Sequence, residues 1–118
     1  MPRPSKAHAV LSDAALGALV GLGERLRQAR LRRNWTQEQT AEKAGLSESS
    51  VKKVEAGSPR IMIAAYLSVL DVFGAPNAFD AVLAPGDDTL GEALARSALR
   101  QRAGSSRRSA DGADEWEL

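Results

Sequence analysis

The feature that most constrains this chain is the 22-residue stretch TQEQTAEKAGLSESSVKKVEAG, which runs from Thr36 to Gly57. It contains two short helical patterns joined by Gly-Leu-Ser. Thr36 and Ser47 are residue types whose hydroxyl groups cap helix N-termini. Gly45 can end the first helix because a left-handed backbone carries no steric cost for glycine. The stretch therefore predicts two short helices separated by a tight turn.

Within this stretch the side chains divide into an inner and an outer set. Two helices that meet near a right angle need a small residue where they touch, and Ala41 supplies it. Val51 and Val54 are spaced to anchor the second helix to a core. The residues left facing outward are Glu48, Ser49, Lys52 and Lys53. This is the helix-turn-helix arrangement, in which the second helix can enter a DNA major groove.

The composition of the 118 residues fits one small helical domain with tails. Aromatic residues make up only 4% of the chain, which argues against a β-sandwich. The absence of cysteine excludes disulfides and cysteine-ligated zinc and fits a reducing compartment. No apolar stretch is long enough to cross a bilayer, and the first 13 residues lack the apolar segment of a signal peptide. We therefore expect a cytoplasmic protein.

The hydrophobic pattern predicts an all-α fold with a five-helix domain over residues 12–84. We expect a disordered arm before it, residues 1–11, and a linker with a C-terminal helix after it, residues 85–103. The last segment, residues 104–118, is small, polar and charged, and we expect it to be a disordered tail.

Within the domain, the first helix should be firm from Leu22 to Arg33 and looser before it, where three glycines interrupt the pattern. The fourth helix should pack one face against the core, and the residues on that face are Ile63, Tyr66, Leu67, Leu70 and Phe73. A short fifth helix over residues 77–84 should turn Phe79, Val82 and Leu83 inward.

Charge is distributed in blocks. Residues 20–60 carry nine Lys or Arg against five Asp or Glu, whereas residues 61–95 carry five acidic residues and no basic one. Residues 96–108 then carry five Arg, and residues 109–118 carry four acidic residues. A basic block on a folded helical unit is a candidate phosphate-binding surface, and a solvated face is the alternative. The acidic block should face away from DNA.

The stretch from LGERLRQARLRRN through YLSVLDVFG resembles the Cro/Xre family of lambda-repressor-like DNA-binding domains. The resemblance covers about residues 21–83. It implies a DNA-binding protein with the five-helix fold. One such domain reads too few base pairs to be selective, so a homodimer on an inverted-repeat operator is implied.

The resemblance assigns DNA contacts to individual positions. The positions matching the base-reading face are Ser47, Glu48, Ser49, Lys52 and Lys53. Lysine can donate to guanine, and glutamate can accept from cytosine. Gln37 and Ser50 match phosphate-contacting positions, and Arg60, just past the third helix, is within reach of phosphate. Ala56 stands where the family often has a polar residue, which removes one expected backbone contact.

Other matched positions are interpreted as structural. Arg30 and Glu55 match a buried pair that ties the first helix to the end of the third. Trp35 is expected to pack over the start of the second helix, with base stacking as the alternative. Three basic residues are expected to be solvated, with phosphate contact as the alternative: Arg32, Arg33 and Lys43.

A narrower resemblance lies in SSVKKVEAGSPRIMIAAYLSVLDVFG and in DDTLGEALARSALRQR with the ending DEWEL. Both are similar to HipB-like antitoxins, which are encoded beside HipA-like toxins with a serine/threonine kinase fold. The resemblance implies the antitoxin of a type II toxin–antitoxin module, which represses its own operon and neutralises such a kinase. Trp116 and Leu118 would anchor the tail to a partner. A solubilising tail, or one recognised by a protease, is the alternative.

Other functions remain as alternatives. An enzyme is not expected, because the single histidine, His8, lies in the N-terminal arm and no catalytic set or metal-ligand cluster is recognisable. No cofactor is expected either. The alternatives to an antitoxin are a stand-alone Xre-family regulator without a toxin partner and a protein-interaction adaptor with a degenerate helix-turn-helix.

Overall fold

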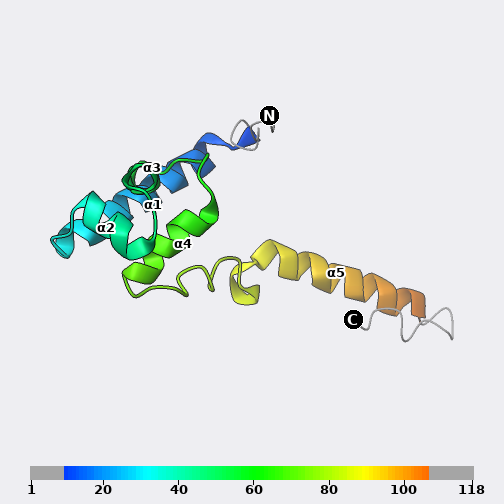
Figure 1. Ribbon diagram of the computed structural model, residues 1–118. Helices are drawn as coiled ribbons and strands as arrows, with labels where there is room; N and C mark the ends of the chain where they lie inside the picture. The colour runs from blue at the N-terminus through cyan, green and yellow to red at the C-terminus, as the bar shows by residue number, and fades with distance from the viewer. Residues whose placement is uncertain (1–9, 107–118) are drawn as a thin grey trace, which may run out of the picture. The chain divides into compact units, whose positions relative to one another are not determined.

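The computed structural model describes residues 10–106, with side chains as far as residue 104. These residues are helical or lie in turns and loops, and none is in a strand, which confirms the all-helical class. The α-helices are α1 (Asp13–Arg32), α2 (Gln37–Ala44), α3 (Glu48–Glu55), α4 (Ile63–Val72) and α5 (Thr89–Ser106), and a 3-10 helix, η2 (Pro85–Asp87), precedes α5 (Figure 1).

The described chain divides into two compact units, one that ends at Ala78 and one that begins at Phe79. The first unit contains α1 to α4. In it, α3 packs against α1, α2 and α4, and α2 also packs against α4. The second unit contains η2 and α5. Among residues 10–106, no helix is long and apolar enough to span a membrane.

The helix ends form at the residues that the sequence indicated. Ser12 caps α1, with its Oγ accepting from the Ala15 N–H at 3.1 Å. Thr36 and Gln39 form a capping box at the start of α2, with hydrogen bonds of 2.9 and 3.0 Å. Gly45 ends α2 with a φ of 68°, so the tight turn uses a backbone conformation that glycine adopts without strain.

The core of the first unit is centred on α3 and α4. The most deeply buried apolar side chains, at most 1% exposed, are Val51, Val54 and Val69. Ala41 is buried at the junction of α2 with its neighbours. The buried Tyr66 hydroxyl donates to the Ser58 carbonyl at 2.7 Å. Burial raises the pKa of the Tyr66 phenol, which keeps this group protonated and donating.

The first helix differs from the expectation that its beginning would be loose, because α1 is one continuous helix of 20 residues. Gly23 is buried, and a Cβ there would lie 2.6 Å from the Glu55 carbonyl oxygen and 2.7 Å from the Gly57 nitrogen. A Cβ on Gly57 would in turn meet the carbonyl oxygen of Leu19 at 2.4 Å. The missing side chains therefore let the end of α3 approach the α1 backbone, and this packing offsets the low helix propensity of glycine.

The prediction of a fifth helix over residues 77–84 is wrong, because this segment lies in turns. Gly74 and Leu83 have left-handed backbones, with φ of 83° and 54°, and the segment between them is too short to be helical without packing. Val82 and Leu83 are 68% and 72% exposed and do not point inward. The predicted C-terminal helix is present as α5 and continues to Ser106.

The fourth helix buries two of the five residues expected on its inner face, Tyr66 and Leu70, while Leu67 and Phe73 are half-buried. Its buried residues are Ala65, Tyr66, Val69 and Leu70. Ile63 is 65% exposed because it lies at the first position of α4, turned away from these residues.

Two glycines of α1 give a direct test of this packing. Gly23→Ala should lower the free energy of unfolding by about 1–3 kcal/mol, because its Cβ would collide with the backbone of α3. Gly17→Ala, at an exposed position with no atom within 4 Å of the added Cβ, should raise it by about 0.5–1 kcal/mol. Urea denaturation of both variants measures the two values, and equal effects would contradict the close contact at Gly23.

Candidate nucleic-acid interface

The solvent side of α3 carries most of the residues predicted to read bases. Val51 and Val54 are 0% exposed, and this anchoring fixes the rotation of the helix about its own axis. The exposed side chains on α3 are Glu48, Ser49, Lys52 and Lys53. They combine ammonium donors, a carboxylate acceptor and a hydroxyl, which are the groups that recognise base edges in a major groove.

Ser47 and Ser50 are coupled at the start of α3. The Ser47 Oγ accepts from the Ser50 N–H at 3.1 Å and donates to the Ser50 Oγ at 2.9 Å. The Ser47 hydroxyl is thus engaged in capping the helix, although sequence analysis placed it among the base-reading groups. The Ser50 hydroxyl accepts one of these bonds and retains its own proton, which suits a donor to phosphate.

Glu48 and Lys52 lie one turn apart on the exposed side of α3. The Lys52 Nζ is 3.7 Å from the Glu48 Oε1, and the two side chains are 60% and 49% exposed. Such a pair contributes a few tenths of a kcal/mol at most to the helix. Its greater effect is to place a negative charge beside one of the two lysines that face solvent.

A buried network connects the start of α2 to the end of α3 and to α1. The Arg30 Nε and Nη2 donate to the two carboxylate oxygens of Glu55, at 2.6 and 3.1 Å. The Gln37 Nε2 donates to the same carboxylate at 3.0 Å, and the Arg30 Nη1 donates to the Trp35 carbonyl at 2.8 Å. The Arg30 and Glu55 side chains are only 9% and 5% exposed.

This network orients Gln37, the first residue of α2, which was predicted to contact phosphate. An amide group has two N–H donors, and one of those of Gln37 is held by Glu55. The second donor and the amides at the start of α2 remain suited to an anion, because the N-terminal end of a helix carries partial positive charge.

An open cleft of about 680 Å³ adjoins this position, between the end of α1 and the starts of α2 and α3. Its lining includes Arg27, Asn34, Gln37 and Glu48. Arg27 was not singled out from the sequence. Arg27 lies three residues before Arg30 on α1, which carries several basic residues. This spacing of one helical turn could have indicated from the sequence that Arg27 shares a side of α1 with Arg30.

The comparisons with known proteins agree with this geometry. A family model described as a helix-turn-helix domain matches residues 21–81, more than half of the chain. The chain belongs to this helix-turn-helix family. It is an Xre/Cro-like DNA-binding protein, in which α2 and α3 form the helix-turn-helix unit. No curated protein and no solved structure matches the chain.

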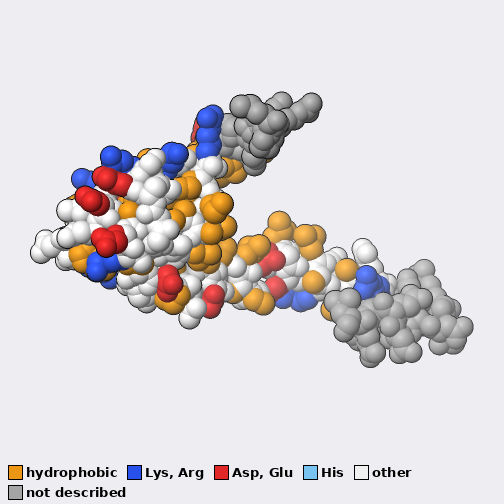
Figure 2. Space-filling model, in the orientation of Figure 1, with side chains coloured by type: hydrophobic (Ala, Val, Ile, Leu, Met, Phe, Trp, Pro, Cys, Tyr) orange, Lys and Arg blue, Asp and Glu red, His pale blue; other side chains and the backbone are white. Residues whose placement is uncertain are grey.

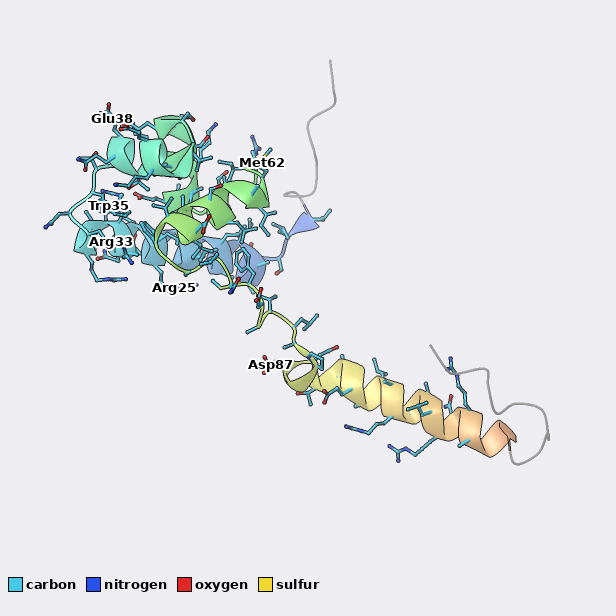
Figure 3. All side chains as sticks on the ribbon, turned by 60° about the horizontal axis from the view of Figure 1, so that its bottom comes forward. Arg25, Arg33, Trp35, Glu38, Met62 and Asp87 are labelled. Atoms are coloured by element: carbon cyan, nitrogen blue, oxygen red, sulfur yellow. The ribbon has the colours of Figure 1, made fainter. Side chains whose placement is uncertain are left out.

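In this helix-turn-helix protein, Arg32, Arg33 and Lys43 are exposed as expected, but Arg33 and Lys43 also contact neighbouring groups. The Arg33 guanidinium donates to the carbonyls of Ala29 and Phe73, at 2.9 and 3.0 Å, and lies 4.8 Å from the Phe73 ring centre. The Lys43 Nζ lies 4.8 Å from the ring centre of Trp35, and the rings of Trp35 and Phe73 are 5.8 Å apart. Arg33 therefore joins the end of α1 to the end of α4, beside Trp35 in Figure 3.

The remaining predicted contacts lie outside the helix-turn-helix unit itself. Arg60 is exposed in the loop after α3, and its backbone N–H donates to the Ser58 Oγ at 3.2 Å. Trp116 and Leu118 lie outside the described residues, so their role as partner anchors stays a prediction.

The buried ion pair predicts a large effect on stability. Glu55→Ala should lower the free energy of unfolding by about 3–5 kcal/mol, because Arg30 would keep a buried charge without its partner. Glu24→Ala is the control: its pair with Arg27 is exposed, so the change should stay within about 0.5 kcal/mol. Thermal or urea unfolding compares them, and a Glu55→Ala protein as stable as Glu24→Ala would remove the pair from the account of the fold.

Proposed function

We propose that the protein is a sequence-specific transcriptional repressor that inserts α3 into the major groove of DNA. The observation that carries the proposal is the exposed face of α3, whose lysines and glutamate are held outward by Val51 and Val54. Gln37 and the start of α2 would hold the phosphate backbone and set the depth of insertion. A homodimer on an inverted repeat would supply the selectivity that one short helix lacks.

The test is the affinity for a duplex selected from a random pool, measured over a series of salt concentrations. The affinity should fall steeply, by about 0.9 log units per log unit of salt for each phosphate neutralised. Lys52→Ala and Lys53→Ala should each weaken binding to the selected duplex by about 1–3 kcal/mol if the lysine reads guanine. A lysine that contacts phosphate would instead lower the salt slope by about one.

Arg25→Ala is the matched control for the lysine variants. Arg25 is exposed on α1 and lies on the side of the first unit away from α2 and α3 in Figure 3. Its loss should leave affinity and salt slope unchanged. Weak binding to every duplex with little salt dependence would contradict the proposal and support a protein-interaction adaptor.

A finer proposal is that the repressor is the antitoxin of a type II module and binds a HipA-like kinase. It is supported by the resemblance of residues 49–74 to HipB-like antitoxins and by the exposed surface of α5. Three leucines of this 18-residue helix, Leu90, Leu94 and Leu99, are 71%, 61% and 46% exposed. A helix of this length with so much apolar surface gains stability when a partner covers it.

Purification from the native host, with the neighbouring genes expressed, tests the finer proposal. A stoichiometric kinase-fold partner identified by mass spectrometry is the expected result. Deletion of residues 104–118 should then weaken toxin binding and leave DNA binding unchanged. Equal toxin affinity after deletion would exclude the tail as a contact, and a repressor that purifies without a partner would be a stand-alone regulator.

A further inference from the structure

The side of α4 away from the core is largely apolar, although it also carries Ser68 and the exposed Asp71. Ala65, Tyr66, Val69 and Leu70 are buried in the core, whereas Ile63 and Ala64 are exposed and Leu67 is half-buried. Ile63 is 65% exposed, and Met62, which immediately precedes α4, is 72% exposed. We call Met62, Ile63, Ala64 and Leu67 the α4 outer face. Exposed apolar side chains gathered on one side of a helix are suited to contact with another protein surface.

The charge around the α4 outer face limits what can cover it. No Lys or Arg occurs from residue 61 to residue 95, and the one charged residue of α4 is Asp71. The α4 outer face itself therefore carries no cation that would bind phosphate or an acidic protein surface. Figure 2 shows hydrophobic side chains gathered along the edge of the first unit where the chain enters α4 in Figure 1.

We propose that the α4 outer face is the dimer interface and that its occupant is the same face of a second copy of this chain. This inference rests on the homodimer of the proposed function and names its contact. A two-fold axis makes each interface residue meet the same patch on the partner, so the patch must be compatible with itself. An apolar patch without basic residues meets that condition, because no like charges lie at its centre.

The position of Asp71 favours an antiparallel over a parallel arrangement of the two α4 helices in the proposed dimer. If the two α4 helices run antiparallel and cross between Ala64 and Leu67, the two Asp71 residues lie about 16 Å apart along the helices. A parallel pair would place the two carboxylates side by side and repel. Ala64, near the crossing point, is small enough to let the helix backbones approach closely.

The proposed contact leaves the recognition surface open. Met62 lies to the side of α3 in Figure 3, at the start of α4, and the exposed lysines of α3 are not part of the α4 outer face. A two-fold axis through α4 would relate two copies of α3 by the same symmetry that relates the halves of an inverted repeat.

The first test compares two single lysine substitutions at matched exposure in the full chain. Ile63→Lys should convert the dimer to a monomer in sedimentation velocity, because each copy would bury an unpaired lysine in an apolar contact. Leu94→Lys changes a leucine of α5 that is 61% exposed and should leave the dimer intact. Thermal unfolding of both variants checks that each remains folded. A dimer that survives Ile63→Lys, or one that Leu94→Lys dissociates, overturns the inference.

A second test uses the fact that the chain contains no cysteine. Ala64→Cys, close to the proposed axis, should give a disulfide-linked dimer on mild oxidation, because the residue meets its own copy. Ala98→Cys on α5 is the control and should remain unlinked at the same protein concentration. Equal cross-linking at the two positions overturns the inference.

The outcomes separate this inference from the proposed function. If the wild-type protein is a dimer and the Ile63→Lys variant is a dimer too, the α4 contact alone is refuted. A dimer that dissociates in Ile63→Lys but binds no duplex refutes DNA recognition and leaves the contact intact. A wild-type protein that is monomeric both alone and on its selected duplex overturns the homodimer and the α4 contact together.

Discussion

The pairing of Arg30 with Glu55 is the interaction on which the arrangement of the DNA-binding unit depends. One carboxylate receives hydrogen bonds from α1 and from the first residue of α2 while it sits at the end of α3. Removing two charges from water is costly, and the cost is offset only when their hydrogen-bonding capacity is used. Among the described residues, no buried side-chain nitrogen or oxygen lacks a partner. The network therefore sets the spacing between the start of α2 and α3.

Close backbone packing between α1 and the end of α3 holds the same helices together as the Arg30–Glu55 pair. Gly23 and Gly57 remove side chains where the end of α3 meets α1, so the two backbones come closer than any other residue type would allow. Ser47 caps the opposite end of α3, and Val51 and Val54 are buried between the two ends. The recognition helix is held at both termini and along one side. Its outward side chains can thus vary without loss of the fold.

The features that could be predicted from the sequence are those decided by local chemistry. The caps at Ser12 and Thr36, the glycine turn and the all-helical class depend on residues a few positions apart. The role of Gly23 and the Arg33 contact with Phe73 depend on segments 32 to 40 residues away, which a pattern in one sequence does not reveal. The error at residues 77–84 has the same origin, since a short apolar segment forms a helix only where a neighbour covers it.

The pairing of Glu48 with Lys52 bears on how such a protein searches a genome. In the proposed complex with DNA, the Glu48 carboxylate on the exposed side of α3 would be repelled by phosphates at every sequence, while the lysines would be attracted. The acid therefore weakens binding to arbitrary sequences, and the loss is recovered only where a base offers it a donor. Competing sites in a genome outnumber any one specific site by many orders of magnitude, so a residue that lowers the affinity for all of them would raise the occupancy of a specific site.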